Sequence, residues 1–416
     1  MIENEVKKER FVLLAAVTDD GSHVAESLRE LAELLLTAGA EPAGQVVQMR
    51  ENIHPGTYLG KGKLEEVRET AAAFDADGVV CDDELTPAQY NNLADILEMK
   101  VMDRTMLILD IFAGRARSRE GKIQVELAQL RYRSARLLGI GRSMSRLGGG
   151  IGTRGPGEKK LEMDRRLIGK RISALKEELA EVKRHRELIR GRRQEGKTKT
   201  CALVGYTNAG KSTLLNRLTG ADVLAEDALF ATLDPTTREL ILPDGDSVLL
   251  TDTVGFIRKL PHHLVEAFKS TLEEAALADL ILHVVDAGSP YMDMQMEAVY
   301  EALRDLGAGE KPVYTLFNKM DRIVFPENRL LDPNARKCFF ISAKEGNGLE
   351  ELLKGLSEFA AEGQILIERE IPYSKAGFLA RIRTEGKLFD EEYLPRGIRI
   401  RARVPRSLYG QMNREL

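Results

Sequence analysis

TCALVGYTNAGKSTLLNRLTG, at residues 200–220, is the stretch that decides the fold of this 416-residue chain. A short apolar strand, 200–205, runs into the loop GYTNAGKS, 205–212, and a helix pattern follows directly. In this order, backbone amides of the loop and of the helix N-terminus converge on a phosphate group. We expect the Lys211 side chain to reach the β- and γ-phosphates of a nucleotide and the Ser212 hydroxyl to bind Mg²⁺. The stretch therefore predicts a P-loop in a nucleotide-binding α/β domain.

A second apolar strand pattern ends in groups that such a domain needs. SVLLTDTVG (247–255) places Asp252 where a carboxylate holds Mg²⁺ through water, and Gly255 where a backbone amide senses the γ-phosphate. In a doubly wound α/β sheet the carboxyl ends of the strands meet at one edge. We therefore expect Asp252 and Gly255 to lie beside the P-loop.

Two further strand patterns, VYTLFNKMD (313–321) and CFFISAKEG (338–346), are expected to recognise the base. Guanine offers two donors, N1–H and the 2-amino group, to the carboxylate of Asp321. Adenine has an acceptor at N1 and no 2-amino group, so the carboxylate would be left unpaired, a loss that discriminates by about 10⁴-fold. A backbone amide at Ser342–Lys344 can meet guanine O6. The order of the motifs along the chain predicts a GTP-specific domain of the small-GTPase type.

The water-positioning residue of many such domains is a Gln directly after the DxxG element, and here that position is Phe256. A phenyl ring neither donates nor accepts the hydrogen bond that orients water, so we expect slow hydrolysis unless a partner completes the site. Asn208 in the P-loop leaves two interpretations open. It binds K⁺ beside the phosphates, as in other GTPases with Asn at this position, or it only stabilises the loop.

Composition describes a chain with ordinary apolar cores: 43% of the residues are hydrophobic and 30% are charged. A run of eighteen apolar residues is absent and the N-terminus does not resemble a signal peptide, so we expect no membrane span. The three cysteines, Cys81, Cys201 and Cys338, are far apart, which indicates neither a disulfide framework nor a zinc site. A reducing cytoplasm is the expected location.

The chain divides by pattern into four parts. Residues 1–112 alternate strand and helix patterns, as in a small parallel sheet covered by helices. Residues 113–197 are read as a helical hairpin, 198–360 as the GTPase domain, and 361–416 as a small α+β module with little core of its own. Strands are expected at 11–17, 46–49, 77–82, 365–371 and 397–405, with helices at 23–39, 63–73 and 87–98.

The predicted hairpin is strongly basic: residues 113–197 contain 24 Lys and Arg against 10 Asp and Glu, a net charge of +14. The remainder of the chain then carries −4 − 14 = −18. Such asymmetry favours binding to a polyanion, with a solvated helical surface as the alternative. A first helix is expected at about 118–138, and a second begins near Glu158 with a heptad stripe of apolar residues. The glycine- and arginine-rich loop between them has a shape suited to a groove of RNA, or is a flexible connector. Its candidate RNA contacts are Arg142, Arg146, Gly148, Gly149, Gly150, Arg154, Gly155 and Gly157.

Long motifs across nearly the whole chain resemble the HflX family of GTPases, within the Obg–HflX branch. The most specific are GGGIGTRGPGEKKLEMDRR (148–166) and DTVGFIRKLPHHLVEAFKSTLEEA (252–275), with YLGKGK (58–63), DRTMLILDIFAGRARS (103–118) and LFATLDPTTR (229–238) beside them. The resemblance implies association with the large ribosomal subunit, separation of stalled or idle ribosomes under stress, and a hairpin loop directed at the peptidyl transferase region.

The resemblance also selects the third group at the magnesium site. Thr232, Thr236 and Thr237 all carry a suitable hydroxyl, and turn chemistry does not decide among them. The family pattern places the sensing threonine at Thr232. We therefore expect Mg²⁺ at Ser212, Thr232 and, through water, Asp252, with Lys211, Gly255 and Phe256 nearest the reaction. The full set expected at GTP is Gly205, Tyr206, Thr207, Asn208, Ala209, Gly210, Lys211, Ser212, Thr213, Phe230, Ala231, Thr232, Leu233, Asp234, Asp252, Thr253, Val254, Gly255, Asn318, Lys319, Met320, Asp321, Ser342, Ala343 and Lys344.

Three functions are compatible with these residues. The first is a ribosome-activated GTPase that binds the large subunit. The second is a GTP-dependent switch that recruits a protein partner, and the third is an RNA-remodelling nucleotidase. The basic hairpin favours the first and third, and the absence of a second phosphate loop disfavours the third. A monomer is expected, because the hairpin satisfies its own heptad stripe.

Overall fold

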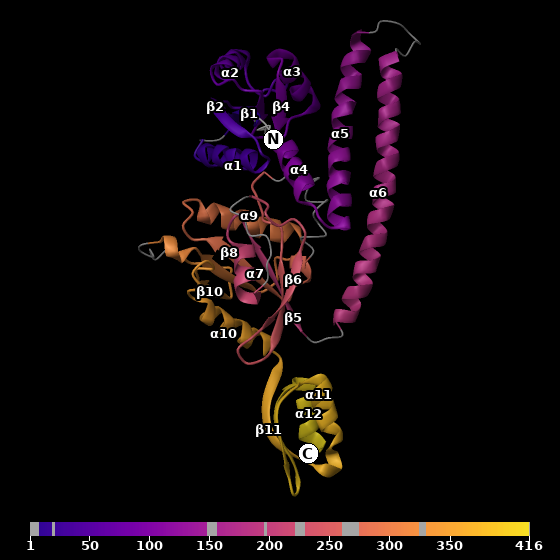
Figure 1. Cartoon of the computed structure of the whole chain (residues 1–416), viewed down its shortest axis with the longest axis vertical. Coiled ribbons are helices and arrows are strands. Elements are labelled where there is room, and N and C mark those ends of the chain that lie inside the picture. Colours follow the sequence, from indigo (N-terminus) through magenta and orange to yellow (C-terminus); the bar gives the residue numbers. More distant parts are fainter. Residues whose placement is uncertain are drawn as a thin grey trace, which may run out of the picture. The chain divides into compact units, whose positions relative to one another are not determined.

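The computed structural model describes residues 8–18, 21–147, 156–194, 198–220, 229–259, 274–323 and 330–415 (Figure 1). The chain forms two compact units. The first comprises residues 1–239 and 249–347, and the second comprises 240–248 and 348–416.

The first unit begins with an N-terminal domain, residues 10–115, built on a parallel sheet of order β2-β1-β3-β4. Its central strand β1 is buried on both faces. Val12 and Leu14 point into one apolar cluster and Phe11 and Leu13 into another, as alternation along a strand requires. The strands are β1 (Arg10–Val17), β2 (Glu41–Met49), β3 (Gly78–Cys81) and β4 (Lys100–Asp103), and the helices are α1 (Val24–Thr37), α2 (Lys61–Ala73), α3 (Pro87–Leu97) and α4 (Arg104–Arg115).

The expected strands and helices of this domain are all present, and β4 and α4 are additional. β4 has four residues and passes directly into α4, so no turn separates the two patterns in the sequence. Asp103 ends the strand and caps the helix, because its side chain accepts a hydrogen bond from the Met106 amide at 2.9 Å.

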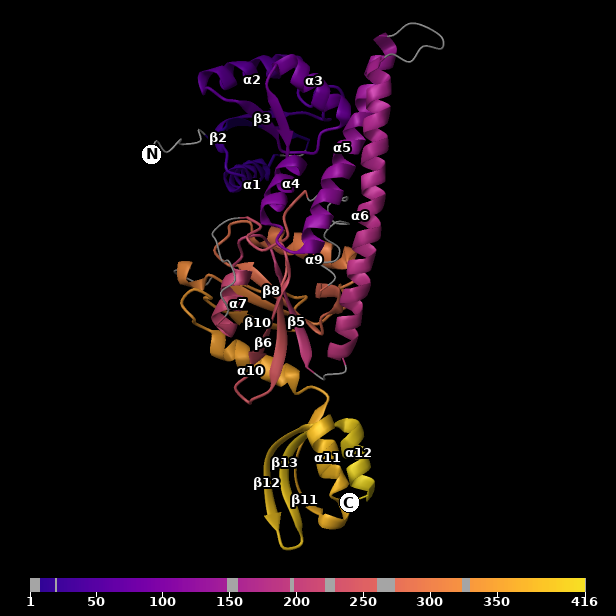
Figure 2. The same ribbon diagram turned by 45° about the vertical axis from the view of Figure 1, so that its right-hand side comes forward.

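Two long antiparallel helices follow, α5 (Arg119–Leu147) and α6 (Pro156–Gln194), side by side in both ribbon views (Figures 1 and 2). Ile123 and Leu127 of α5 pack with Leu175 of α6. Ile172, Leu179 and Val182 complete the seam, which confirms the predicted heptad stripe over this stretch. The predicted end of the first helix at 138 is wrong, because α5 continues through two glycines to Leu147.

The nucleotide domain, residues 199–340, holds a six-stranded sheet of order β10-β9-β8-β5-β7-β6. β5, β8, β9 and β10 pair in parallel, and β8 and β9 are buried along almost their whole length, as expected for a doubly wound α/β sheet. Its elements are β5 (Lys199–Gly205), α7 (Lys211–Thr219), β6 (Thr236–Ile241), β7 (Ser247–Asp252), β8 (Leu280–Asp286), α9 (Met292–Asp305), β9 (Val313–Asn318) and β10 (Lys337–Phe340).

The second unit contains α10 (Leu349–Ala360) and an antiparallel sheet of order β11-β13-β12, with α11 and α12 on one face (Figure 2). These elements are β11 (Gln364–Pro372), α11 (Gly377–Glu385), β12 (Lys387–Leu394), β13 (Gly397–Pro405) and α12 (Arg406–Glu415). β12 and α12 are absent from the sequence prediction. The expectation of little core is also wrong, because eleven apolar side chains of this unit are buried together. Arg403 joins the two segments of the unit by an ion pair with Asp244 at 3.0 Å.

Among the described residues, no helix has both the length and the apolar character that crossing a membrane requires.

Candidate nucleotide-binding site

The P-loop connects β5 to α7, and two of its glycines are required by their surroundings. Gly205 has φ +155°, and a Cβ there would lie 2.2 Å from the Val284 carbonyl oxygen. Gly210 has φ +95°, and a Cβ would lie 2.4 Å from the side-chain amide of Asn318. Both positions therefore exclude larger residues, and the loop lies directly against β8 and β9.

Lys211 is buried at the start of α7, with its ammonium group turned into the loop. Its Nζ donates to the carbonyl oxygens of Gly205 at 3.1 Å and Tyr206 at 2.9 Å. Burial lowers its pKa to about 8, and the charge of Asp252 opposes the shift. A bound phosphate would supply the negative charge that this buried ammonium lacks.

The three groups predicted for Mg²⁺ converge. The Ser212 hydroxyl lies 2.8 Å from that of Thr232 and donates to Asp252 at 2.8 Å. Thr237 pairs instead with Thr251 at 2.9 Å, so the structure brings Thr232 and not Thr237 to Ser212.

The chemistry of this cluster fits a hard divalent cation. One carboxylate oxygen of Asp252, Oδ1, is buried and has no hydrogen-bond partner among the described residues. Burial raises the pKa of Asp252, against the effect of Lys211. A carboxylate and two hydroxyl oxygens form the kind of ligand set that Mg²⁺ prefers, directly or through water. These residues would hold the ion, which would neutralise charge on the phosphates.

The base-recognition motifs are joined to the P-loop by Asn318. Its side-chain amide donates to the Ala209 carbonyl at 2.8 Å and accepts from the Ala343 amide at 2.9 Å. Ser342 donates to the Asp321 carboxylate at 2.6 Å, a contact that lowers the pKa of Asp321. Lys319 forms an ion pair with Asp286 at 2.7 Å. The carboxylate that is to read guanine is therefore ionised and oriented before a base arrives.

Phe256 lies in the apolar core, with only 3% of its surface exposed. Its backbone pairs with the P-loop: the Phe256 amide donates to the Gly205 carbonyl at 3.0 Å, and the Thr207 amide donates to the Phe256 carbonyl at 2.8 Å. The ring thus has a packing role, which the sequence comparison with a catalytic Gln did not reveal.

The remaining predicted residues divide between the phosphate pocket and its supports. Phe230, Ala231 and Thr213 line the same small pocket as Lys211 and Thr232. Other predicted residues contact the protein: Thr253 donates to the Leu203 carbonyl, Val254 and Leu233 are buried in the core, Met320 packs partly against an apolar cluster and Lys344 is exposed.

Asp234 turns to the connection between α4 and α5. Its carboxylate accepts hydrogen bonds from the amides of Arg117 and Ser118 at 2.9 and 2.8 Å. Phe230 packs edge-on against Phe112 of α4, with ring centroids 4.7 Å apart. The segment around Thr232 therefore rests on the elements that lead into the hairpin.

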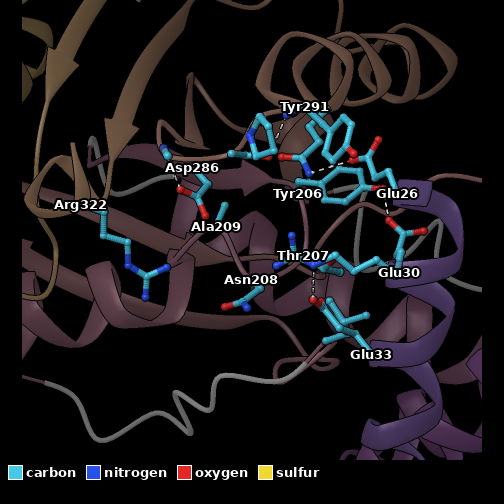
Figure 3. Close-up of a pocket in the computed structure, with 16 residues that line it drawn as sticks. Glu26, Glu30, Glu33, Tyr206, Thr207, Asn208, Ala209, Asp286, Tyr291 and Arg322 are labelled. Atoms are coloured by element: carbon cyan, nitrogen blue, oxygen red, sulfur yellow. Dashed lines mark hydrogen bonds and ion pairs between the residues drawn. The ribbon is translucent and has the colours of Figure 1, made fainter. Parts of the chain in front are cut away.

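A cleft of about 220 Å³ opens beside the P-loop, and sequence reasoning missed the side chains that form its far wall. Figure 3 shows Glu26, Glu30 and Glu33 of α1 facing Tyr206, Thr207 and Asn208. Tyr206 and Glu30, which are in contact here, lie 176 residues apart in the chain. No local sequence pattern in α1 predicts this contact with the P-loop.

The candidate RNA contacts lie on or beyond the ends of the hairpin helices. Arg142 and Arg146 belong to the last turns of α5, and Gly157 belongs to the first turn of α6. Gly148, Gly149, Gly150, Arg154 and Gly155 lie outside the described residues. The described ends therefore place two of the arginines on a helix where a loop was expected.

Known protein families and relatives match most of this chain. Residues 25–113 match the family model described as GTP-binding GTPase N-terminal, 115–193 match GTP-binding GTPase Middle Region, and 200–319 match 50S ribosome-binding GTPase. Relatives named GTPase HflX match over most of the chain. The protein of Lacrimispora saccharolytica is 59% identical over 99% of this chain and 97% of its own, and that of Caldanaerobacter subterraneus subsp. tengcongensis is 51% identical over 95% and 91%. The Escherichia coli K12 protein is 46% identical over 80% of this chain and 79% of its own.

Proposed function

The chain belongs to the HflX family of GTPases, and from this premise we propose that it acts on the ribosome, binding the large subunit in its GTP state and separating the subunits of stalled or idle ribosomes. The GTPase activity itself follows from family membership and the P-loop domain. The ribosomal role is supported by the description of the matching family, 50S ribosome-binding GTPase.

The observation that carries the proposal is the antiparallel hairpin, whose region holds a net charge of +14 in a chain of −4. Two helices of 29 and 39 residues carry most of this charge along an elongated hairpin, and Lys and Arg side chains gain affinity for RNA by neutralising its phosphates. Protein-partner recruitment would not require a polycation of this length.

The proposed chemistry uses residues that already converge. Lys211 and the P-loop amides bind the β- and γ-phosphates, and Ser212, Thr232 and Asp252 would hold a Mg²⁺ ion that would neutralise phosphate charge. The Gly255 amide detects the γ-phosphate. Since the Phe256 ring is buried, water must be oriented by another group, and we assign this role to a ribosomal contact. A K⁺ ion at Asn208 would instead add positive charge beside the phosphates.

The test is steady-state GTP hydrolysis by the full chain, in K⁺ or Na⁺, alone and with purified large ribosomal subunits. We expect a slow basal rate that rises strongly with subunits. A rate that ribosomes leave unchanged would preserve the GTPase and favour a protein-recruiting switch instead.

A charge-reversal pair sharpens this test. Arg142→Glu with Arg146→Glu should weaken stimulation by the subunits, because phosphate contacts lose affinity when their cations are removed. Arg401→Glu with Arg414→Glu, at exposed sites on β13 and α12, is the control with the same change of charge and should retain stimulation. Equal stimulation in both variants would contradict the role of the hairpin.

A further inference from the structure

A buried arginine, Arg104, lies where the N-terminal and nucleotide domains meet. Only 1% of its surface is exposed. Its guanidinium donates to the Asp82 carboxylate at 2.7 Å, to the Ser27 carbonyl at 3.2 Å and to the carboxylate of Glu30. It also donates to the Arg258 carbonyl at 3.2 Å. One cation thus fixes two carboxylates of its own domain and reaches the backbone that follows Phe256.

The second oxygen of Glu30 completes the link to the P-loop. Tyr206 donates its hydroxyl hydrogen to Glu30 Oε2 and accepts a hydrogen bond from the Arg258 amide at 2.9 Å. The Tyr206 side chain is buried. Figure 3 shows its ring directed from the P-loop toward Glu30 and Glu26 on α1. A single hydroxyl therefore joins α1, the P-loop and the segment after the DxxG motif.

That segment is held at two points. At Phe256 the backbone pairs with Gly205 and Thr207, as described above. At Arg258 it is held between the Tyr206 hydroxyl, which accepts from its amide, and Arg104, which donates to its carbonyl. Lys259 extends the contact through an ion pair with Asp83 at 2.7 Å.

Gly255 stands at the phosphate end of the same segment and has almost no free space. A Cβ at Gly255 would lie 2.9 Å from Thr207 Cα and 3.0 Å from Lys211 Nζ. The backbone at Gly255 therefore packs closely on the P-loop, and a displacement of residues 255–258 would change the position of the amide that is expected to sense the γ-phosphate. Positioning of this kind governs rate, because preorganised donors stabilise the transition state without reorganisation.

We propose that Tyr206 is a positioning residue for GTP hydrolysis, whose hydroxyl, oriented by Glu30 and Arg104, holds residues 255–258 in the place that hydrolysis requires. The inference rests on the GTPase activity and is independent of ribosome binding. It gives the N-terminal domain a direct part in the reaction, since Glu30 and Arg104 both belong to that domain.

Tyr206→Phe tests the hydroxyl alone. The ring and the P-loop backbone remain, and the Arg258 amide and Glu30 Oε2 lose their shared partner. In the absence of ribosomes we expect kcat to fall about tenfold, the factor for one lost buried hydrogen bond. KM for GTP and the affinity for GDP should stay within about twofold, because no contact to ribose or base changes.

Tyr300→Phe is the matched control. Tyr300 also donates to a carboxylate, that of Asp332 at 2.6 Å, in the same nucleotide domain but away from residues 255–258. The Tyr300→Phe variant should hydrolyse GTP at the wild-type rate. If Tyr206→Phe lowers kcat no more than Tyr300→Phe, or weakens GDP binding as much as it lowers kcat, positioning by the hydroxyl is wrong.

Variants of Glu30 separate positioning from folding. Glu30→Gln keeps an acceptor for Tyr206 and should retain more activity than Glu30→Ala. Glu30→Ala also removes the ion pair with Arg104, but it shares the Tyr206 contact with Tyr206→Phe, so the combined loss should be smaller than the sum of the two single losses. Fully additive losses would overturn the proposal. A wild-type chain that does not hydrolyse GTP would instead refute the GTPase assignment, so the two failures are distinguishable.

Discussion

Asp234 caps the backbone amide of Ser118 at 2.8 Å, immediately before α5 begins at Arg119. Ser118 in turn accepts a hydrogen bond from the Gly121 amide at 2.9 Å, so the first turn of α5 depends on this pair. Thr232, whose hydroxyl lies beside that of Ser212, is two residues before Asp234 in the chain. The phosphate pocket is thus connected to the base of the hairpin through two residues of chain and the hydrogen bonds of Asp234.

Asp234→Ala should release the amides of Arg117 and Ser118. We expect faster hydrogen exchange at these two amides, because their acceptor is lost and the site is exposed to water. The measurement is amide exchange followed by mass spectrometry of peptides that span 115–122. Asp279→Ala, which removes an equivalent cap from the Thr200 amide, should speed exchange near Thr200 and leave 115–122 unchanged.

Asp321→Asn should shift the base preference from guanine toward xanthine. An amide nitrogen donates where the carboxylate accepted, so it pairs with the 2-oxo group of xanthine and loses the 2-amino contact of guanine. The preference for GTP should fall by up to about 10⁴-fold in competition binding. Ser342→Ala removes only the group that orients Asp321, so it should weaken GTP binding with no gain for xanthosine triphosphate. Unaltered GTP affinity in Asp321→Asn would remove the base-reading role.

Phe256→Gln should not create a fast GTPase. The position faces the core, so the change buries an amide and empties apolar volume, at a cost of about 3 kcal/mol. We expect a lower thermal midpoint and no rise in basal hydrolysis. Phe340→Gln, at a half-exposed phenylalanine of β10 that stacks on Phe317, is the control and should lower the midpoint less. A substantial rate increase in Phe256→Gln would show that the side chain reaches water.

Because of His283, the free energy of unfolding should decrease as the pH falls below about 6.5. Burial in β8 lowers its pKa from 6.5 to about 4, so the folded chain keeps the imidazole neutral while the unfolded chain protonates it. Between these values the unfolded state binds more protons, and the free energy of unfolding is lost as pH falls through the window. At about pH 5 the loss amounts to about 2 kcal/mol, or several degrees in thermal midpoint. His283→Gln cannot titrate and should show a shallower decline over the same range, and an identical decline would exclude His283 as the cause.

The nucleotide motifs could be predicted because each is local. A strand end and the few residues after it fix Ser212, Asp252 and Asp321, and the parallel sheet then brings those ends together. The choice of Thr232 came from resemblance, and the 2.8 Å contact with Ser212 agrees with it. The strand patterns and the spacing of the motifs were sufficient to predict Ser212, Asp252 and Asp321.

The network at Arg104 could not be predicted, because its partners are distant in sequence. Asp82, Glu30 and Arg258 lie 22, 74 and 154 residues away. Charged residues of α1 resemble an ordinary solvated helix surface until the nucleotide domain covers them. The length of α5 was missed for another reason. Its glycines are poor helix formers, at a cost of about 1 kcal/mol each, so the local preference favours an earlier end than the one α5 has.

The partners of Arg104 are unevenly distributed along the chain, and this bears on the order in which the protein is built. Asp82, Glu30 and Ser27 all precede Arg104, so the emerging chain neutralises this guanidinium before any of the nucleotide domain has been synthesised. One carboxylate oxygen of Glu30 and one N–H group of Arg104 have their partners, Tyr206 and Arg258, in the part of the chain that is synthesised later. We therefore expect the domain made first to present Glu30 and Arg104 to the phosphate-sensing segment when the later domain folds.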